Sequence, residues 1–158
     1  PIPQFKAVRA IWKAPRFFNL YGPTETNVCT FYEVPADESW ADMATFPIGK
    51  ICKPNLGWVV DEDTQTVTRG APGDLLISGP NVMQGYWNLD EQNQCVFVTD
   101  QAGRRWYRTG DIVTEDEWSE YRYLGRRDRM VKRRGYRVEL GEIARAVRGS
   151  KHSHLILP

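Results

Sequence analysis

The sequence predicts a mixed α/β fold in which short strands dominate and a helix follows near the end of the chain. Strand-like segments separated by turns fill the stretch from Ile48 to Val98. Near the C-terminal end, apolar residues recur at positions i, i+3, i+4 and i+7, which is the pattern of one amphipathic helix: Leu140, Ile143, Ala144 and Val147. With 41% hydrophobic and 26% charged residues among 158, the composition is that of a globular protein.

The opening third gives a weaker pattern. Phe5–Phe17 reads as a poor helix or strand broken at Pro15. Arg16–Tyr21 is a short aromatic and apolar run that stops at Gly22-Pro23, so we expect a buried strand that ends in a turn. The acidic segment Pro35–Phe46 is expected to be a loop.

The middle of the chain predicts several short strands. Gly57–Val60 leads into an acidic turn, and Thr66–Thr68 is separated from Asp74–Ser78 by a Gly/Pro turn, which predicts two strands around that turn. Trp106–Arg108 predicts a strand that stops at a turn over Thr109–Asp111. A last short strand is expected over 121–124.

A domain boundary is expected near Gly125–Asp128, where the strand pattern gives way to a basic loop and the amphipathic helix, for which Gly149 is a plausible stop. We therefore assign residues 1–127 to one domain and 128–158 to the start of a second. The charge changes at nearly the same place. Residues 1–121 hold 10 basic and 17 acidic residues, whereas residues 122–158 hold 11 and 3. Such asymmetry indicates an anionic partner or two lobes that attract each other.

The cysteines argue against two classes of site. Cys29, Cys52 and Cys95 are far apart and odd in number, which argues against a disulfide framework and a zinc site and favours reduced, mostly buried thiols. A cytoplasmic location is the corresponding expectation. The apolar runs are too short to cross a bilayer, so no membrane partner is expected.

Two short motifs place polar groups at strand ends. Asn19–Glu25 offers an amide, an aromatic ring, a hydroxyl and a carboxylate, which suit a base, a phosphate and Mg²⁺, although the segment is also compatible with an ordinary turn. In Tyr107–Asp111, the carboxylate of Asp111 follows a glycine and can accept hydrogen bonds from a ribose diol, or simply cap the turn.

The third motif is basic. Seven of the twelve residues from Arg126 to Arg137 are Lys or Arg, interleaved with a tyrosine. Such density suits nucleic-acid phosphates, the phosphates of one nucleotide, or a solvated surface.

In this order and spacing, the motifs resemble the amino-acid adenylation domains of nonribosomal peptide synthetases, within the adenylate-forming superfamily. Asn19–Glu25, Tyr107–Asp111 and Gly125–Leu140 are similar to three signature segments, and Gly73–Gly79 with Gly85–Trp87 to a fourth. The resemblance implies an internal fragment of that fold: the end of a large α/β domain, a small β-barrel-like subdomain, a hinge and the start of a C-terminal lid domain. It further implies that the phosphate loop, the aspartate that binds the substrate amine and the catalytic lysine lie outside this chain.

The resemblance also implies a function. Such enzymes use ATP and Mg²⁺ to form an aminoacyl-adenylate and pass the aminoacyl group to the phosphopantetheine thiol of a peptidyl carrier protein. By position, the resemblance implies that Tyr21 lines the adenine, with Asn19, Gly22 and Tyr123 nearby. It implies that Thr24 binds the α-phosphate and that Glu25 binds the magnesium ion. It also implies that Asp111 holds the ribose hydroxyls and that Arg126 reaches the ribose or the phosphates. Asp128 is the implied hinge, Lys132 steadies one lid orientation, and Gly135–Leu140 faces the pantetheine. On this basis no nucleic-acid partner is expected.

Three positions implied to line the side-chain pocket are apolar: Leu20, Val28 and Cys29. Because burying an unpaired charge is costly, an apolar amino acid is expected, and the combination resembles stand-alone prolyl adenylases. The alternatives are an acyl-CoA or aryl-acid ligase of the same superfamily, and a truncated, non-catalytic remnant or interaction module. The isolated chain is expected to be inactive.

Overall fold

The computed structural model describes residues 2–127, 131–133 and 136–138. The chain divides into two compact units, Pro1–Gly125 and Arg126–Pro158, and each is described by itself. Among the described residues, no helix combines the length and the apolar character needed to cross a membrane.

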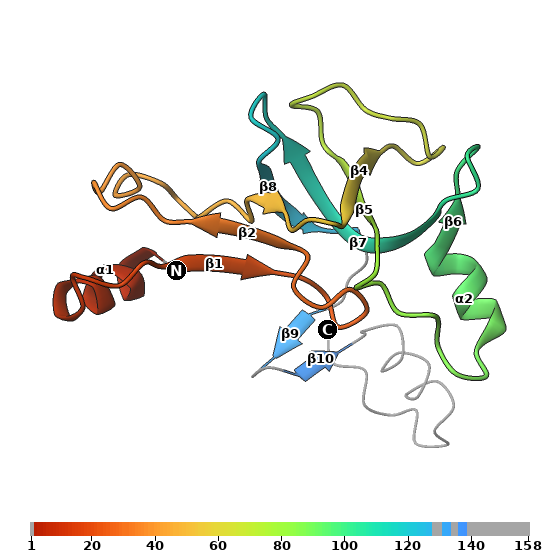
Figure 1. Cartoon of the computed structure of the whole chain (residues 1–158), viewed down its shortest axis with the longest axis horizontal. Helices are drawn as coiled ribbons and strands as arrows, with labels where there is room; N and C mark the ends of the chain where they lie inside the picture. The colour runs from red at the N-terminus through yellow and green to blue at the C-terminus, as the bar shows by residue number, and fades with distance from the viewer. Residues whose placement is uncertain (1, 128–130, 134–135, 139–158) are drawn as a thin grey trace, which may run out of the picture. The chain divides into compact units, whose positions relative to one another are not determined.

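The first unit opens with a helix and a small sheet (Figure 1). The helix α1, Ile2–Ile11, precedes three antiparallel strands in the order β1 (Phe18–Tyr21), β2 (Thr30–Glu33) and β3 (Lys50–Ile51). The ambiguous opening segment is thus helical before Pro15. Its Phe5 ring makes edge-on contacts with three aromatic rings, those of Phe17, Trp40 and Phe46. These edge-to-face contacts stabilise the helix against the 35–46 loop.

The expectation that β1 is buried was wrong. Phe18 and Leu20 are 43% and 57% exposed, because they project from the face of β1 that the described residues leave open. The opposite face carries Asn19 and Tyr21, which are half-buried. An aromatic and apolar run therefore predicted the strand but not its exposure.

A second, larger sheet follows. Its strands β4 (Leu56–Val60), β5 (Gly73–Ser78), β7 (Arg105–Glu115) and β6 (Phe97–Thr99) are hydrogen-bonded in that order, and β8 (Tyr121–Arg126) also pairs with β7. The sheet does not close into a barrel over the described residues. All six residues of β5 are buried, since Leu75 and Ile77 pack in one hydrophobic cluster and Leu76 packs in another. The short helix α2, Asp90–Val96, leads into β6.

Two strand predictions in this sheet need correction. Thr66–Thr68 forms only an isolated bridge, Val60 to Thr66, and not a strand. The predicted turn over Thr109–Asp111 lies inside β7, which continues for 11 residues through it. Gly110 has a φ of 74° there, so the local signal of a turn reflects an irregularity in a strand.

The two sheets share a hydrophobic core. Cys29 and Ile48 from the first part of the chain pack with five buried residues of the larger sheet: Val59, Leu75, Ile77, Val113 and Tyr121. Backbone bonds join the same regions, since Ile48 N–H donates to the carbonyl of Tyr121 at 2.9 Å and Tyr121 N–H to that of Gly49 at 2.8 Å. The first sheet is therefore joined to the second through both side chains and backbone.

In the second unit, the basic segment predicted as a loop contains an antiparallel pair of strands, β9 (Val131–Arg133) and β10 (Tyr136–Val138). Lys132 is opposite Arg137 in this pair. The helix predicted over Leu140–Val147 and the hinge residue Asp128 lie outside the described residues.

Candidate functional site

The loop between β1 and β2 presents the first motif. Cys29 N–H donates to the carbonyl of Tyr21 at 2.9 Å and closes the loop. A Cβ placed on Gly22 would lie 1.7 Å from the carbonyl oxygen of Asn27, so only glycine allows this close approach. The tight turn fixes the directions of Thr24, which is exposed, and of Glu25, which is buried.

The second motif meets the first through a side-chain contact. The hydroxyl of Tyr21 donates a short hydrogen bond to Oδ2 of Asp111, although 90 residues separate them. Burial raises the pKa of Tyr21, and the charge of Asp111 raises it further, while a hydrogen bond with Thr109 opposes the shift. The phenol therefore stays protonated and donates to the carboxylate. This contact brings two predicted site residues together.

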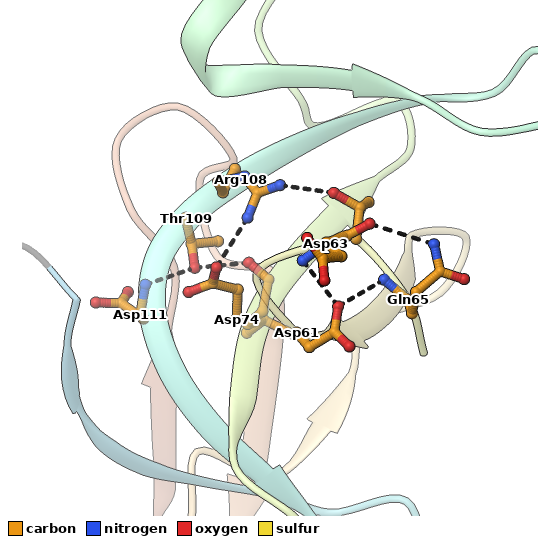
Figure 2. Close-up of polar contacts among 9 residues, drawn as sticks. Asp61, Asp63, Gln65, Asp74, Arg108, Thr109 and Asp111 are labelled. Carbon is orange, nitrogen blue, oxygen red and sulfur yellow. Dashed lines mark hydrogen bonds and ion pairs between the residues drawn. The ribbon is translucent and has the colours of Figure 1, made fainter. Parts of the chain in front are cut away.

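Asp111 is only 5% exposed and is also held through its backbone. Its N–H donates to the hydroxyl of Thr109 at 3.1 Å. Figure 2 shows this bond and the adjacent ion pair between Arg108 and Asp74, and it shows the Asp111 carboxylate pointing away from that pair. The carboxylate of Asp111 thus faces Tyr21 and not the nearby cation.

Glu25 has a partner that the sequence did not indicate. The hydroxyl of Tyr86 donates to Oε1 of Glu25 at 2.5 Å, and Met83 N–H donates to the backbone carbonyl of Glu25 at 2.8 Å. Burial and the hydrogen bond to Glu25 raise the pKa of Tyr86, so this phenol is also a donor. Tyr86 belongs to the Gly85–Trp87 segment noted for its resemblance, but no spacing rule links it to a residue 61 positions earlier.

The remaining predicted nucleotide contacts lie at varied positions. Asn19 donates its amide to the carbonyl of Pro47 at 2.7 Å, which ties β1 to the segment before β3. Tyr123 is 44% exposed on β8, the strand next to β7. Arg126 ends β8 but belongs to the second unit, as does Lys132. Of the predicted site residues, the structure thus joins Tyr21 to Asp111, while Glu25 is held separately by Tyr86 and Met83; all of these lie in the first unit.

The three predicted pocket residues are not enclosed together in the described part of the chain. Leu20 and Val28 are 57% and 37% exposed, whereas Cys29 is fully buried in the shared core. Burial raises the pKa of the Cys29 thiol to about 11. All three cysteines are free, but only Cys29 is buried, since Cys52 is half-buried and Cys95 is exposed. The expectation of mostly buried thiols was therefore wrong.

Two cavities of the first unit lie away from the predicted site residues. One of about 550 Å³ is lined by residues of α1, by Lys13 and by the 38–41 loop, and another of about 210 Å³ lies beside β4. Neither is lined by a predicted site residue. No group of three or more metal-ligating side chains occurs within the described residues.

Comparisons with known proteins show the family of this chain. The family model described as "AMP-binding enzyme" matches residues 3–87, more than half of the chain. The chain belongs to this family. One of the linear gramicidin synthase proteins of Brevibacillus parabrevis is 44% identical over 136 residues, which cover 84% of the chain and 2% of that protein. An L-proline–(L-prolyl-carrier protein) ligase of Streptomyces coelicolor is also 44% identical, over 148 residues that cover 92% of the chain and 27% of the ligase.

A solved structure described as an NRPS protein containing adenylation and PCP domains superposes on this AMP-binding family chain with a TM-score of 0.83 and 28% identity. The superposition covers 96% of the chain and 31% of that protein. These comparisons confirm the resemblance to nonribosomal peptide synthetase adenylation domains and the α/β architecture of part of an adenylate-forming enzyme. The chain spans about a quarter or less of the length of the two curated relatives.

Proposed function

We propose that the protein carrying this chain activates an amino acid with ATP and transfers it to a carrier protein. The observation that carries this proposal is the Tyr21–Asp111 hydrogen bond. It joins two motifs that are 90 residues apart and lie on different sheets. Together with membership of the AMP-binding enzyme family, this supports a nucleotide site at the junction of the β1–β2 loop and β7.

In this proposal the residues of the first unit hold ATP for attack. Asp111 accepts hydrogen bonds from the ribose hydroxyls, Tyr21 lines the adenine beside Asn19 and Gly22, and Tyr123 packs near the base. Thr24, exposed on the tight loop, binds the α-phosphate. A carboxylate oxygen of the amino acid attacks the α-phosphorus, the bond to pyrophosphate breaks, and pyrophosphate leaves. Positioning of the two reactants supplies much of the rate enhancement. Arg126 is proposed to stabilise the charge that builds on the phosphate.

Glu25 suits a magnesium ion by the chemistry of its donor. A carboxylate oxygen is a hard ligand, and Mg²⁺ usually binds one or two carboxylates together with substrate phosphates, so a cluster of protein ligands is not needed. Tyr86 already orients this carboxylate through the 2.5 Å hydrogen bond. When bound, the ion neutralises charge on the phosphate oxygens.

The second half-reaction is proposed to follow with a different lid orientation. A phosphopantetheine thiolate on a carrier protein attacks the aminoacyl carbonyl, and AMP leaves. Asp128 is the proposed hinge, Lys132 the residue that steadies one orientation, and the segment around Gly135–Leu140 the contact with the pantetheine arm. The solved neighbour with a PCP domain and the ligase named for a prolyl-carrier protein support a carrier-protein partner.

Proline is the proposed substrate. Leu20, Val28 and Cys29 offer no charge to a side chain, and the relative from Streptomyces coelicolor is named for proline. The equally similar gramicidin synthase protein indicates that overall identity alone does not select a substrate. The free cysteines fit a reducing compartment, and we propose the cytoplasm. Neither nucleic acid nor membrane is a proposed partner.

The test is ATP–pyrophosphate exchange by the full-length protein against the proteinogenic amino acids, with fatty and aryl acids as competitors. Exchange with proline supports the whole proposal. Preference for leucine or valine removes proline but keeps the apolar pocket, whereas preference for lysine or aspartate removes both. Exchange only with fatty or aryl acids indicates the ligase alternative, and no exchange with any acid indicates a non-catalytic remnant. The isolated 158 residues are proposed to show no exchange.

A further inference from the structure

The pairing of β5 with β7 is irregular at the residue proposed to hold the ribose. Leu76 is opposite Arg108, but Asp74, two residues earlier, is opposite Ile112. Two steps along β5 therefore correspond to four along β7, so Thr109, Gly110 and Asp111 bulge out opposite Leu75. Such bulges interrupt the backbone ladder and often redirect a side chain next to a functional site.

The hydroxyl of Thr109 bridges this bulge. It donates to the carbonyl of Leu75 at 2.8 Å and accepts the N–H of Asp111 at 3.1 Å. A hydroxyl can fill both roles at once because it carries one donor and two acceptor lone pairs. Thr109 is only 2% exposed, so water cannot easily replace these bonds. One side chain thus links the bulged backbone of Asp111 to the buried central strand.

A second link spans the bulge through an ion pair. Nη1 of Arg108, on one side of the bulge, lies 2.8 Å from Oδ2 of Asp74, which pairs on the other side. Nη2 of Arg108 also donates to the hydroxyl of Thr64 at 3.1 Å, and Figure 2 shows Arg108 beside Asp74. The ion pair holds the strands together, whereas the Thr109 hydroxyl bonds directly to Asp111.

We propose that Thr109 is a positioning residue for Asp111 and through it determines how well the site recognises the ribose. The inference rests on the proposed nucleotide function. Asp111 is held at both ends: its backbone N–H by Thr109 and its carboxylate by Tyr21. Without the Thr109 hydroxyl, the N–H of Asp111 and the carbonyl of Leu75 lose a shared partner, the bulge relaxes, and the carboxylate leaves the position that the ribose requires.

The experiment compares Thr109→Val, which removes the hydroxyl but keeps the shape, with Thr109→Ser, which keeps the hydroxyl. Thr30→Val is the matched control, because Thr30 is equally buried and donates to a backbone carbonyl, that of Ile48, at 2.6 Å. In the full-length protein, dissociation constants for ATP and 2′-deoxy-ATP are measured by calorimetry, together with the KM for ATP and the thermal midpoint. The ratio of the two dissociation constants reports ribose recognition independently of turnover.

We expect Thr109→Val to reduce the preference for ATP over 2′-deoxy-ATP by about tenfold, the effect of a charge-assisted hydrogen bond. Thr109→Ser keeps the preference for ATP. Thr30→Val lowers the thermal midpoint but also keeps the preference for ATP. An unchanged preference in a folded Thr109→Val variant overturns the inference. Asp111→Asn distinguishes failure of the Thr109 role from failure of the proposed ribose site. If Asp111→Asn also leaves the preference unchanged, the proposed ribose site itself is wrong. If Asp111→Asn abolishes the preference and Thr109→Val does not, only the role of Thr109 is lost.

Discussion

The Tyr21 hydroxyl donates to the carboxylate of Asp111 and thereby connects the end of β1 with the middle of β7. The acceptor, Asp111, is only 5% exposed, and the donor, Tyr21, is half-buried. A hydrogen bond to a buried charge contributes more than one between neutral groups, because the charge has lost its hydration. This contact is therefore both a structural link between the sheets and the proposed centre of the nucleotide site.

Replacing Tyr21 by phenylalanine is expected to lower the free energy of unfolding by about 1–3 kcal/mol, since Asp111 loses a donor while it stays buried. The KM for ATP should rise because the carboxylate is no longer oriented. Urea unfolding and exchange kinetics measure the two effects. Tyr32→Phe is the control, because Tyr32 is a buried tyrosine that packs with Ile2, Val34 and Trp40 and not with Asp111. A Tyr21→Phe variant as stable and as active as the wild type would show that the bond is incidental.

Replacing Asp74 by alanine is expected to cost about 3 kcal/mol, because it leaves the partly buried Arg108 without its ion-pair partner. The matched control is Glu33→Ala, which breaks an ion pair with Arg16 of similar length, 2.7 Å, between exposed side chains. Exposed pairs contribute little, so Glu33→Ala should be nearly neutral. Equal midpoints in urea for the two variants would contradict this difference.

Replacing Tyr86 by phenylalanine is expected to weaken magnesium recognition without removing the proposed ligand. Glu25 loses the 2.5 Å hydrogen bond that orients its carboxylate. Partners of this kind typically change metal affinity about 10- to 100-fold. Calorimetric titration of ATP with and without Mg²⁺ measures the coupling directly, and exchange at varied Mg²⁺ is a second readout. If the coupling between Mg²⁺ and ATP is the same in Tyr86→Phe, then Tyr86 does not support a metal ligand.

The cysteines are expected to differ sharply toward a maleimide. With a pKa of about 11, Cys29 is a thiolate in only about one molecule in a thousand at pH 8, and its burial blocks access, whereas Cys95 is exposed. Because folding raises the pKa of Cys29 above its ordinary value of 9.0, its contribution to stability is complete below pH 9 and is lost as the pH rises toward 11. The raised pKa of Tyr21 acts in the same direction at still higher pH. Mass spectrometry after brief maleimide labelling at pH 8 checks that Cys95 is modified before Cys29. Rapid modification of Cys29 in the folded protein would contradict this expectation.

Tyr21, Glu25 and Asp111 were predicted as site residues through the resemblance of their motifs to adenylation domains, and their side chains suit that chemistry. Sequence reasoning mistook the setting of Asp111, since Thr109–Asp111 has the composition of a turn while the structure keeps it inside β7. The bulge depends on the register of β5 and on one hydroxyl, neither of which local propensity encodes. The Tyr86–Glu25 contact was missed for a similar reason, because it joins residues 61 positions apart.

The exposure of β1 could not be predicted from its residues alone. An aromatic and apolar run is compatible with either face being covered, and exposure depends on which other segments pack there. Phe18 and Leu20 are exposed in the described structure, while Asn19 and Tyr21 are held by their hydrogen bonds to Pro47 and Asp111. Sequence patterns thus predicted the strand, and tertiary contacts decided its faces.

The most direct test of the central claim is a crystal structure of the full-length protein grown with AMP. The account predicts that a carboxylate oxygen of Asp111 lies about 2.6–2.9 Å from the ribose 2′ or 3′ hydroxyl, with Tyr21 still donating to the other side of that carboxylate. The adenine should lie beside the β1–β2 loop. AMP bound at another surface, or a ribose that contacts neither Asp111 nor its supporting residues, would contradict the account.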